Sequence, residues 1–396
     1  MGVTDGKLEK RFLHHARRLM PLPTAPFREQ FVMEAISRQA TELGLETQSD
    51  AVGNLLLVYR GNRDSGFVPR VIFTAHMDHP GLLYSRPVSP RDHLFELAGN
   101  VNVDLAKKSE VDIYDPAGTA DQAPVRGVID SYAGPEGGRP VFSVRTARAD
   151  SGLLTPDSFA MWRLPVLRQQ GRLLRGRACD DLAGVTVGLA VMDHLRRSRS
   201  RTCAGLLLTR AEETGFGGMM AAVRGGWLPR EPLYINIECS SRRAGAALGA
   251  GPVIRVGDRI SVFDPRLCAG LVAMAEGEAE SFEGRGLPYQ RKLMDGGACE
   301  ATVLALAGFQ VGAVALPLDH YHNWGRKRLR PEAIDIGDAG ALVKLLVRAA
   351  VCREGVAGSG EGVQRNVERR LETRYRSQRP RLEEARSPRP LGGIPK

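Results

Sequence analysis

Four apolar stretches have the composition of buried strands, and each leads towards acidic or histidine side chains. The stretches cover residues 71–75, 206–209, 234–237 and 311–316. The side chains that follow them are, in chain order, His76, Glu212 with Glu213, Glu238 and, a few residues on, His322. Because ligands of open α/β sheets bind outside the carboxyl ends of the strands, these side chains can converge on one crevice. Histidine and carboxylate ligands suit divalent cations, so the pattern predicts a two-metal hydrolase.

Two pairs of adjacent acids strengthen this interpretation. Glu212 and Glu213 come directly after an apolar strand, where they repel each other unless a cation neutralises them. A metal pair would do so and leave one glutamate to accept a proton from a water that the metals hold. Asp180 and Asp181 precede a helix-like run, where aspartate also serves as an N-cap, so one can cap the helix while the other bridges metals. The alternative for the glutamates is a solvated turn.

His76 and Asp78 are two residues apart in an extended segment, so their side chains leave on the same face. One can bind metal while the other orients it as a hydrogen-bonded carboxylate. A histidine after a strand is often only structural. Its place beside an aspartate, with acid pairs elsewhere, favours a metal ligand.

The pattern of apolar residues predicts an α/β protein whose mixed central sheet is flanked by helices, with an inserted, small all-β domain resembling a barrel. Residues 1–84 and 171–352 are expected to form the catalytic domain. Residues 85–170 alternate short β-like runs with turns rich in glycine and proline, which is typical of a β insert. Residues 353–396 begin with several glycines and then mix arginine with glutamate, and they are expected to form a basic, flexible tail.

Composition argues against a disordered, secreted or membrane-spanning protein. The 396 residues are 43% hydrophobic and 25% charged, which is ordinary for a globular chain. Half of the net charge of +10 lies beyond Cys352, so nucleic acid is not the expected partner of the body. Six scattered cysteines fit reduced thiols, and neither a secretion signal nor an apolar run long enough to cross a membrane is visible. We expect a cytoplasmic protein without a membrane partner.

The motifs also resemble those of one known family. Residues 75–81, 179–184, 210–215 and 321–323 occur in the order and spacing of the glutamyl aminopeptidase and tetrahedral aminopeptidase family of di-metal peptidases. The resemblance extends from about Phe12 to Val351. It includes the β insert, a segment at 50–54 that resembles the family's entry strand, and a glycine-rich turn at 296–301.

This resemblance implies roles for individual residues. The implied set is His76 and Glu238 on one metal, Glu213 and His322 on the other, Asp180 bridging both, Glu212 as general base and Asp78 orienting His76. Two divalent ions per chain are implied, with zinc preferred and cobalt or manganese also effective. The β insert would mediate assembly into a homo-oligomer.

The expected function is therefore an aminopeptidase, which removes N-terminal residues from peptides through a water activated by two metals. The chain has Glu238 where the family commonly has aspartate, and this leaves a deacylase or a carboxypeptidase-type amidohydrolase open as an alternative. A third alternative, from another class, is a non-catalytic protein that holds metal or associates with nucleic acid through its basic tail.

Overall fold

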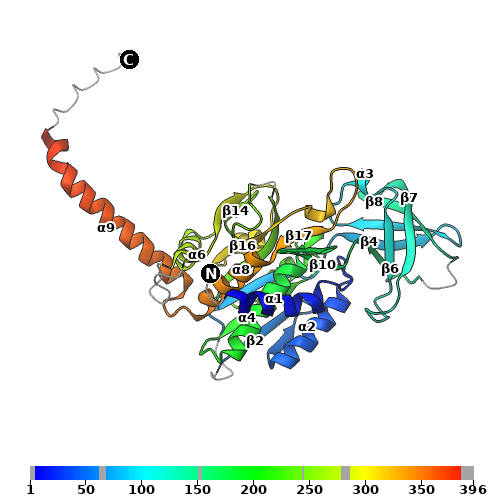
Figure 1. The fold of residues 1–396 in the computed structure, drawn as a ribbon, viewed down its shortest axis with the longest axis horizontal. Coiled ribbons are helices and arrows are strands. Elements are labelled where there is room, and N and C mark those ends of the chain that lie inside the picture. Colours follow the sequence, from blue (N-terminus) through cyan, green and yellow to red (C-terminus); the bar gives the residue numbers. More distant parts are fainter. Residues whose placement is uncertain (1–4, 62–67, 150–153, 243–244, 278–285, 385–396) are drawn as a thin grey trace, which may run out of the picture.

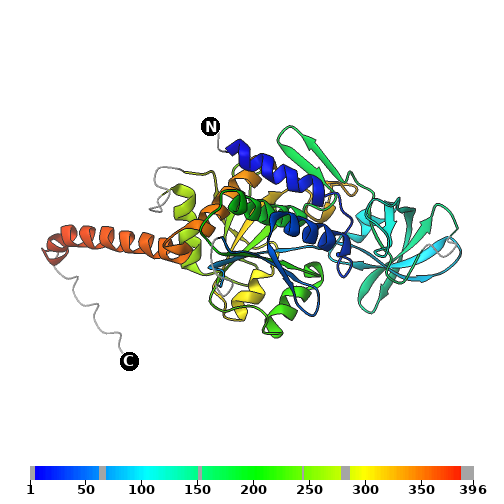
Figure 2. The same cartoon turned by 90° about the horizontal axis from the view of Figure 1, so that it is seen from below.

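The computed structural model describes residues 5–61, 68–149, 154–242, 245–277 and 286–384. These residues form an α/β body with a β-barrel at one end (Figure 1). A long C-terminal helix projects from the opposite end, as a view from below also shows (Figure 2). The predicted fold class, a mixed sheet flanked by helices with a β insert, is confirmed.

The central sheet has eight strands in the order β1-β2-β12-β3-β13-β16-β14-β15. Their bounds are β1 Glu46–Ser49, β2 Leu55–Tyr59, β3 Val71–His76, β12 Ala204–Thr209, β13 Leu233–Ser241, β14 Val253–Asp258, β15 Gln290–Met294 and β16 Val311–Leu318. The four middle strands, β12, β3, β13 and β16, run parallel to one another. Their carboxyl ends therefore meet at one edge of the sheet, where the sequence places the acidic and histidine side chains.

Helices cover both faces of this sheet. Their bounds are α1 Asp5–Leu19, α2 Gln30–Leu43, α4 Leu182–Arg197, α5 Gly217–Arg224, α6 Pro265–Glu276, α7 Ala301–Leu306 and α8 Ile336–Val351. Side chains alternate along each strand, so Leu55 and Leu57 join the core beneath α1, α2, α4, α6 and α8, whereas Leu56 and Val58 join the core beneath α5 and α7. Both sides of the parallel strands are thus buried, and this explains their continuous apolar composition.

The β insert is a closed six-stranded barrel in the order β4-β5-β8-β7-β6-β9. Its elements are β4 Gly81–Pro87, β5 Asp92–Ala98, the short helix α3 Val103–Ala106, β6 Glu110–Tyr114, β7 Val125–Glu136, β8 Arg139–Thr146 and β9 Phe159–Trp162. The barrel strands thus run from 81 to 162, whereas the expected insert runs from 85 to 170. The difference at the far end arises because β10 (Leu167–Gln170) pairs with β11 (Leu173–Gly176), which pairs in turn with β17 (Glu332–Asp335).

The tail differs from the flexible segment expected there. Helix α9 runs from Gly355 to Glu384, and its first turns pack along α6. The glycines make this close approach possible, because a Cβ at Gly360 would clash with the carbonyl oxygen of Arg266, and one at Gly270 with that of Val356. Residues 385–396, the rest of the expected tail, lie outside the described residues. Among the described helices, none is both long and apolar enough to cross a membrane.

Candidate metal centre

The parallel strands bring the residues singled out in the sequence to one edge of the sheet. His76 ends β3, Glu238 lies within β13, and Glu212 and Glu213 form a 3-10 turn (η1, Glu212–Thr214) after β12. The remaining two arrive from other elements: Asp180 lies just before α4, and His322 lies in a second 3-10 turn (η4, Tyr321–Asn323) after β16. All five predicted metal ligands and the predicted base therefore line one cavity of about 850 Å³.

Asp180 stands between two clusters of potential ligands. Its Oδ1 is 3.6 Å from Nε2 of His76, and its Oδ2 is 3.6 Å from Nε2 of His322. On the first side, Glu238 Oε2 is 4.0 Å from the same His76 nitrogen. On the second side, Glu213 Oε2 is 3.1 Å from the same His322 nitrogen. Each cluster offers one imidazole nitrogen and two carboxylates within 4.8 Å of one another, and Asp180 belongs to both.

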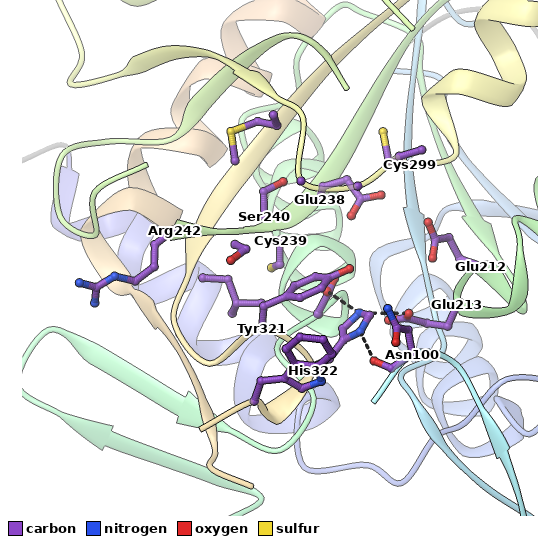
Figure 3. Close-up of a pocket in the computed structure, with 18 of the residues that line it drawn as sticks. Asn100, Glu212, Glu213, Glu238, Cys239, Ser240, Arg242, Cys299, Tyr321 and His322 are labelled. Carbon is purple, nitrogen blue, oxygen red and sulfur yellow. Dashed lines mark hydrogen bonds and ion pairs between the residues drawn. The ribbon is translucent and has the colours of Figure 1, made fainter. Parts of the chain in front are cut away.

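Backbone carbonyls fix the orientation of both histidines. Nδ1 of His322 lies 2.6 Å from the carbonyl oxygen of Asn100, and Nδ1 of His76 lies 3.2 Å from that of Asp78. A carbonyl only accepts, so each Nδ1 donates and each Nε2 is left to bind a ligand. Figure 3 shows the His322 ring between Glu213 and Asn100, with the ring of Tyr321 stacked against it at a centroid distance of 3.7 Å.

The electrostatics of the cluster favour a bound cation. Burial raises the pKa of Glu238 to about 8, with repulsion from Asp180 adding to the rise and attraction to His76 opposing it. Burial also raises the pKa of Glu212 well above its ordinary value. Three carboxylate oxygens here are buried without a hydrogen-bond partner in the described part of the chain: Asp180 Oδ1, Glu213 Oε1 and Glu238 Oε1. Buried acceptors that lie this close together fit divalent cations. Bound cations would coordinate these atoms and favour the ionised form of the carboxylates.

A buried glutamate that the sequence does not single out holds the segment carrying Asp180. Oε2 of Glu332, in β17, accepts hydrogen bonds from the backbone nitrogens of Cys179 and Asp180 at 2.7 and 3.0 Å. The ring of His79 contacts the carbonyl oxygen of Asp180 through Nδ1 at 2.5 Å and Asn323 Oδ1 through Nε2 at 3.0 Å. These contacts tie the bridging aspartate to the turn that carries His322. The neighbouring Asp181 caps α4 by accepting from the backbone of Gly184, as one reading of the acid pair predicts.

Asp78 makes stronger contacts with the glutamate turn than with His76. Its Oδ1 and Oδ2 accept hydrogen bonds from the backbone nitrogens of Glu212 and Glu213 at 3.0 and 3.1 Å. Its Oδ1 is 3.5 Å from Nδ1 of His76. The contact through which Asp78 was predicted to orient this histidine is therefore longer than its hydrogen bonds to the turn. Asp78 therefore also positions the turn that carries the predicted base.

A second buried carboxylate holds the same turn from the other side. Glu29, just before α2, accepts hydrogen bonds from the backbone of Ala211 at 3.0 Å and from Nε of Arg210 at 2.7 Å. Ala211 has a left-handed backbone with φ of 51°, which a residue other than glycine adopts at some cost. Glu29 lies 182 residues from Ala211 in the sequence, and no local motif marks it.

Four arginines line the cavity: Arg242, Arg255, Arg259 and Arg326. Figure 3 shows Arg242 well separated from Glu212 and Glu213. Arg255 is only 4% exposed, and its Nε has no hydrogen-bond partner among the described residues. A buried guanidinium of this kind is suited to an anionic group on a ligand.

The part of the chain that carries most of the site residues is similar to a known family. Residues 145–338 match the family model described as M42 glutamyl aminopeptidase. These residues, just under half of the chain, are similar to that family. The matched residues include Asp180, Glu212, Glu213, Glu238 and His322. His76 and Asp78 precede the matched residues in the sequence, and the fold places them beside the others. The comparison with curated proteins gives no match.

Solved structures of TET peptidases and of another archaeal aminopeptidase share the fold. The TET1 peptidase of Pyrococcus horikoshii is 20% identical with a TM-score of 0.69, over 86% of this chain and 99% of that one. A TET aminopeptidase from a marine Thaumarchaeota archaeon is 17% identical with a TM-score of 0.72, over 89% of this chain and 99% of that one. An aminopeptidase of Desulfurococcus kamchatkensis is 20% identical with a TM-score of 0.69, over 89% of this chain and 98% of that one. The family match, together with these folds, confirms the predicted resemblance and supports the predicted metal-dependent aminopeptidase.

Proposed function

We propose that this chain removes N-terminal residues from peptides by hydrolysis at a site for two divalent cations, most suitably zinc. The observation that carries the proposal is the position of Asp180, which presents one carboxylate oxygen to each of two histidine-containing clusters. His76 and Glu238 would hold one cation, and Glu213 and His322 the other. When bound, the cations would polarise the scissile carbonyl and lower the pKa of the attacking water.

Glu212 is the proposed general base. It lines the cavity, it is 9% exposed, and its carboxylate lies within ligand distance of His76 and Glu213 without belonging to either Asp180 cluster. It would accept the proton of the attacking water and deliver it to the leaving amine. The raised pKa that burial gives Glu212 suits a group that takes up a proton and then releases it.

The arginines that line the cavity support a preference for acidic N-terminal side chains. Arg255 is buried among the lining residues, and a substrate carboxylate beside it would satisfy its guanidinium. The same arginines would also accept the C-terminal carboxylate of a carboxypeptidase substrate, so the amidohydrolase alternative remains a second candidate.

The barrel supports a proposal about assembly. The structures with this fold include a peptidase that assembles into a tetrahedron or a large octahedral shell. We propose that this chain also forms a homo-oligomer, with the β4–β9 barrel as the contact domain, since the barrel projects from one end of the α/β body (Figure 1).

Substitution of the proposed base tests the assignment. Glu212→Gln keeps the size of the side chain but cannot accept the proton, so it should retain bound metal and lose most turnover, by about 10²-fold or more. Metal content and turnover of free-amine aminoacyl substrates would be measured on the same preparation. Unchanged turnover with full metal content would contradict the role of Glu212.

A further inference from the structure

The outer part of α9 is a strongly basic surface that the peptidase site does not use. Residues 364–382 are all exposed and include seven arginines, two glutamates and neither lysine nor aspartate. The segment therefore carries a charge of +5 over 19 residues. The arginines are Arg365, Arg369, Arg370, Arg374, Arg376, Arg379 and Arg381.

The base of this helix is fixed to the body. Val356 is 1% exposed, and Gly360 packs against the backbone of α6 too closely to admit a side chain. Arg70 donates a hydrogen bond to the carbonyl oxygen of Arg353, just before the helix, at 2.9 Å. Beyond this base the helix projects away from the α/β body, at the end opposite the barrel (Figure 2). The basic segment is thus presented to the surroundings in a defined direction.

The helix carries none of the proposed catalytic residues. The solved structures are matched over 98–99% of their own length, whereas 11–14% of this chain has no counterpart in them, a length sufficient to include the helix. The family match ends at residue 338, before the helix begins. The proposed catalysis therefore does not explain the arginines.

We propose that the outer segment of α9, residues 364–382, binds nucleic acid through the phosphate backbone. Guanidinium groups donate paired hydrogen bonds to phosphate oxygens, and this segment has arginine as its only cation. At about 1.5 Å per residue the segment is about 28 Å long, enough to follow a groove over about eight base pairs. Tyr375, 51% exposed, would stack on an unpaired base of a single strand.

The distribution of charge around the helix favours nucleic acid over a membrane. The exposed apolar residues form one narrow stripe: Val367, Leu371, Tyr375 and Leu382. Arginines flank this stripe on both sides, and Arg369 and Arg376 lie on the opposite face at helical spacing. A membrane would contact only the face that carries the stripe. A groove with phosphates along both walls would contact arginines on both flanks.

The test is the salt dependence of binding to a labelled duplex. Fluorescence anisotropy of a 20-base-pair duplex of mixed sequence would be followed with the full chain, with the triple variant R370Q/R374Q/R381Q, and with the control R38Q/R126Q/R224Q. The control removes three exposed arginines from the body and leaves α9 intact. The triple variant should weaken binding at least tenfold and lower the slope of log K against log salt by up to about 2.7, or about 0.9 for each lost phosphate contact. The duplex binding of the control variant should change little, and so should the peptidase activity of both variants.

Three outcomes would overturn the proposal. The first is no binding of duplex or single strand by the full chain at low salt. The second is an equal loss of binding in the triple variant and the control, which would indicate attraction by net charge alone. The third is that polyglutamate or vesicles with anionic lipid bind through α9 while the duplex does not, which would assign the helix to an acidic protein or a membrane.

Discussion

Glu29 should control both the stability and the activity of the protein, although it does not line the cavity. The carboxylate is fully buried, and it accepts hydrogen bonds from the backbone of Phe27 at 2.9 Å and of Ala211 at 3.0 Å, and from Arg210 at 2.7 Å. Glu29→Ala leaves these donors without a partner at a site from which water is largely excluded. Removal of one member of a buried ion pair costs about 3–5 kcal/mol, and we expect a loss of stability of this size.

The same change should slow catalysis, because Glu29 holds the left-handed residue that precedes Glu212. A displacement of the base by about 1 Å can lower the rate by about 10²-fold. Glu29→Gln keeps a neutral oxygen as acceptor, so its loss of stability should be smaller, about 1–3 kcal/mol. Free energies of unfolding would be measured by urea denaturation, and kcat with a free-amine aminoacyl substrate.

Glu34→Ala is the matched control in the neighbouring helix α2. Glu34 is exposed, and its ion pair with Arg38 is long, at 3.9 Å, so its removal should cost less than about 1 kcal/mol and leave kcat unchanged. The reasoning would be refuted if Glu29→Ala cost no more than Glu34→Ala, or if it lost stability while kcat stayed at the level of the parent protein.

Three further predictions concern other parts of the molecule. Burial raises the pKa of Asp193, but hydrogen bonds from His15 and Arg197 outweigh it and hold this pKa well below its ordinary value. The ionised group therefore stabilises the fold above about pH 4 and loses this effect as pH falls, so Asp193→Asn should flatten the acid limb of unfolding free energy measured against pH. Arg255→Met should raise KM for substrates with N-terminal glutamate about tenfold relative to leucine, measured in parallel assays; equal changes would reject its role in selecting acidic side chains. Gly360→Leu should detach α9 from α6, which limited proteolysis would detect as faster removal of the tail.

The strand ends that carry the metal ligands could be predicted because apolar runs followed by acids are local patterns. His76, Glu213 and Glu238 each follow a run that is buried in the sheet. Parallel pairing then brings these ends to one edge regardless of their separation in sequence. The tertiary structure adds what this rule leaves out, namely which oxygen of Asp180 faces which histidine.

The residues that position the ligands could not be predicted in this way. Glu29, Asn100 and Glu332 act on segments between 152 and 222 residues away, and nothing in their local sequence distinguishes them from surface residues. The glycines of the tail led to the prediction of a flexible segment for a related reason. Glycine permits both a flexible linker and close packing of helices, and only the presence of α6 decides between the two.

The most direct test of the central claim combines metal content with substrate cleavage. Bound metal would be measured by elemental analysis, and cleavage of matched free-amine and N-acylated aminoacyl substrates would be measured before chelation, after it, and after zinc is restored. The proposed function predicts two divalent ions per chain and cleavage of free-amine substrates that is lost on chelation and recovered with zinc. Cleavage of N-acylated substrates alone would make the protein a deacylase, and a chain that binds no metal would contradict the proposed site.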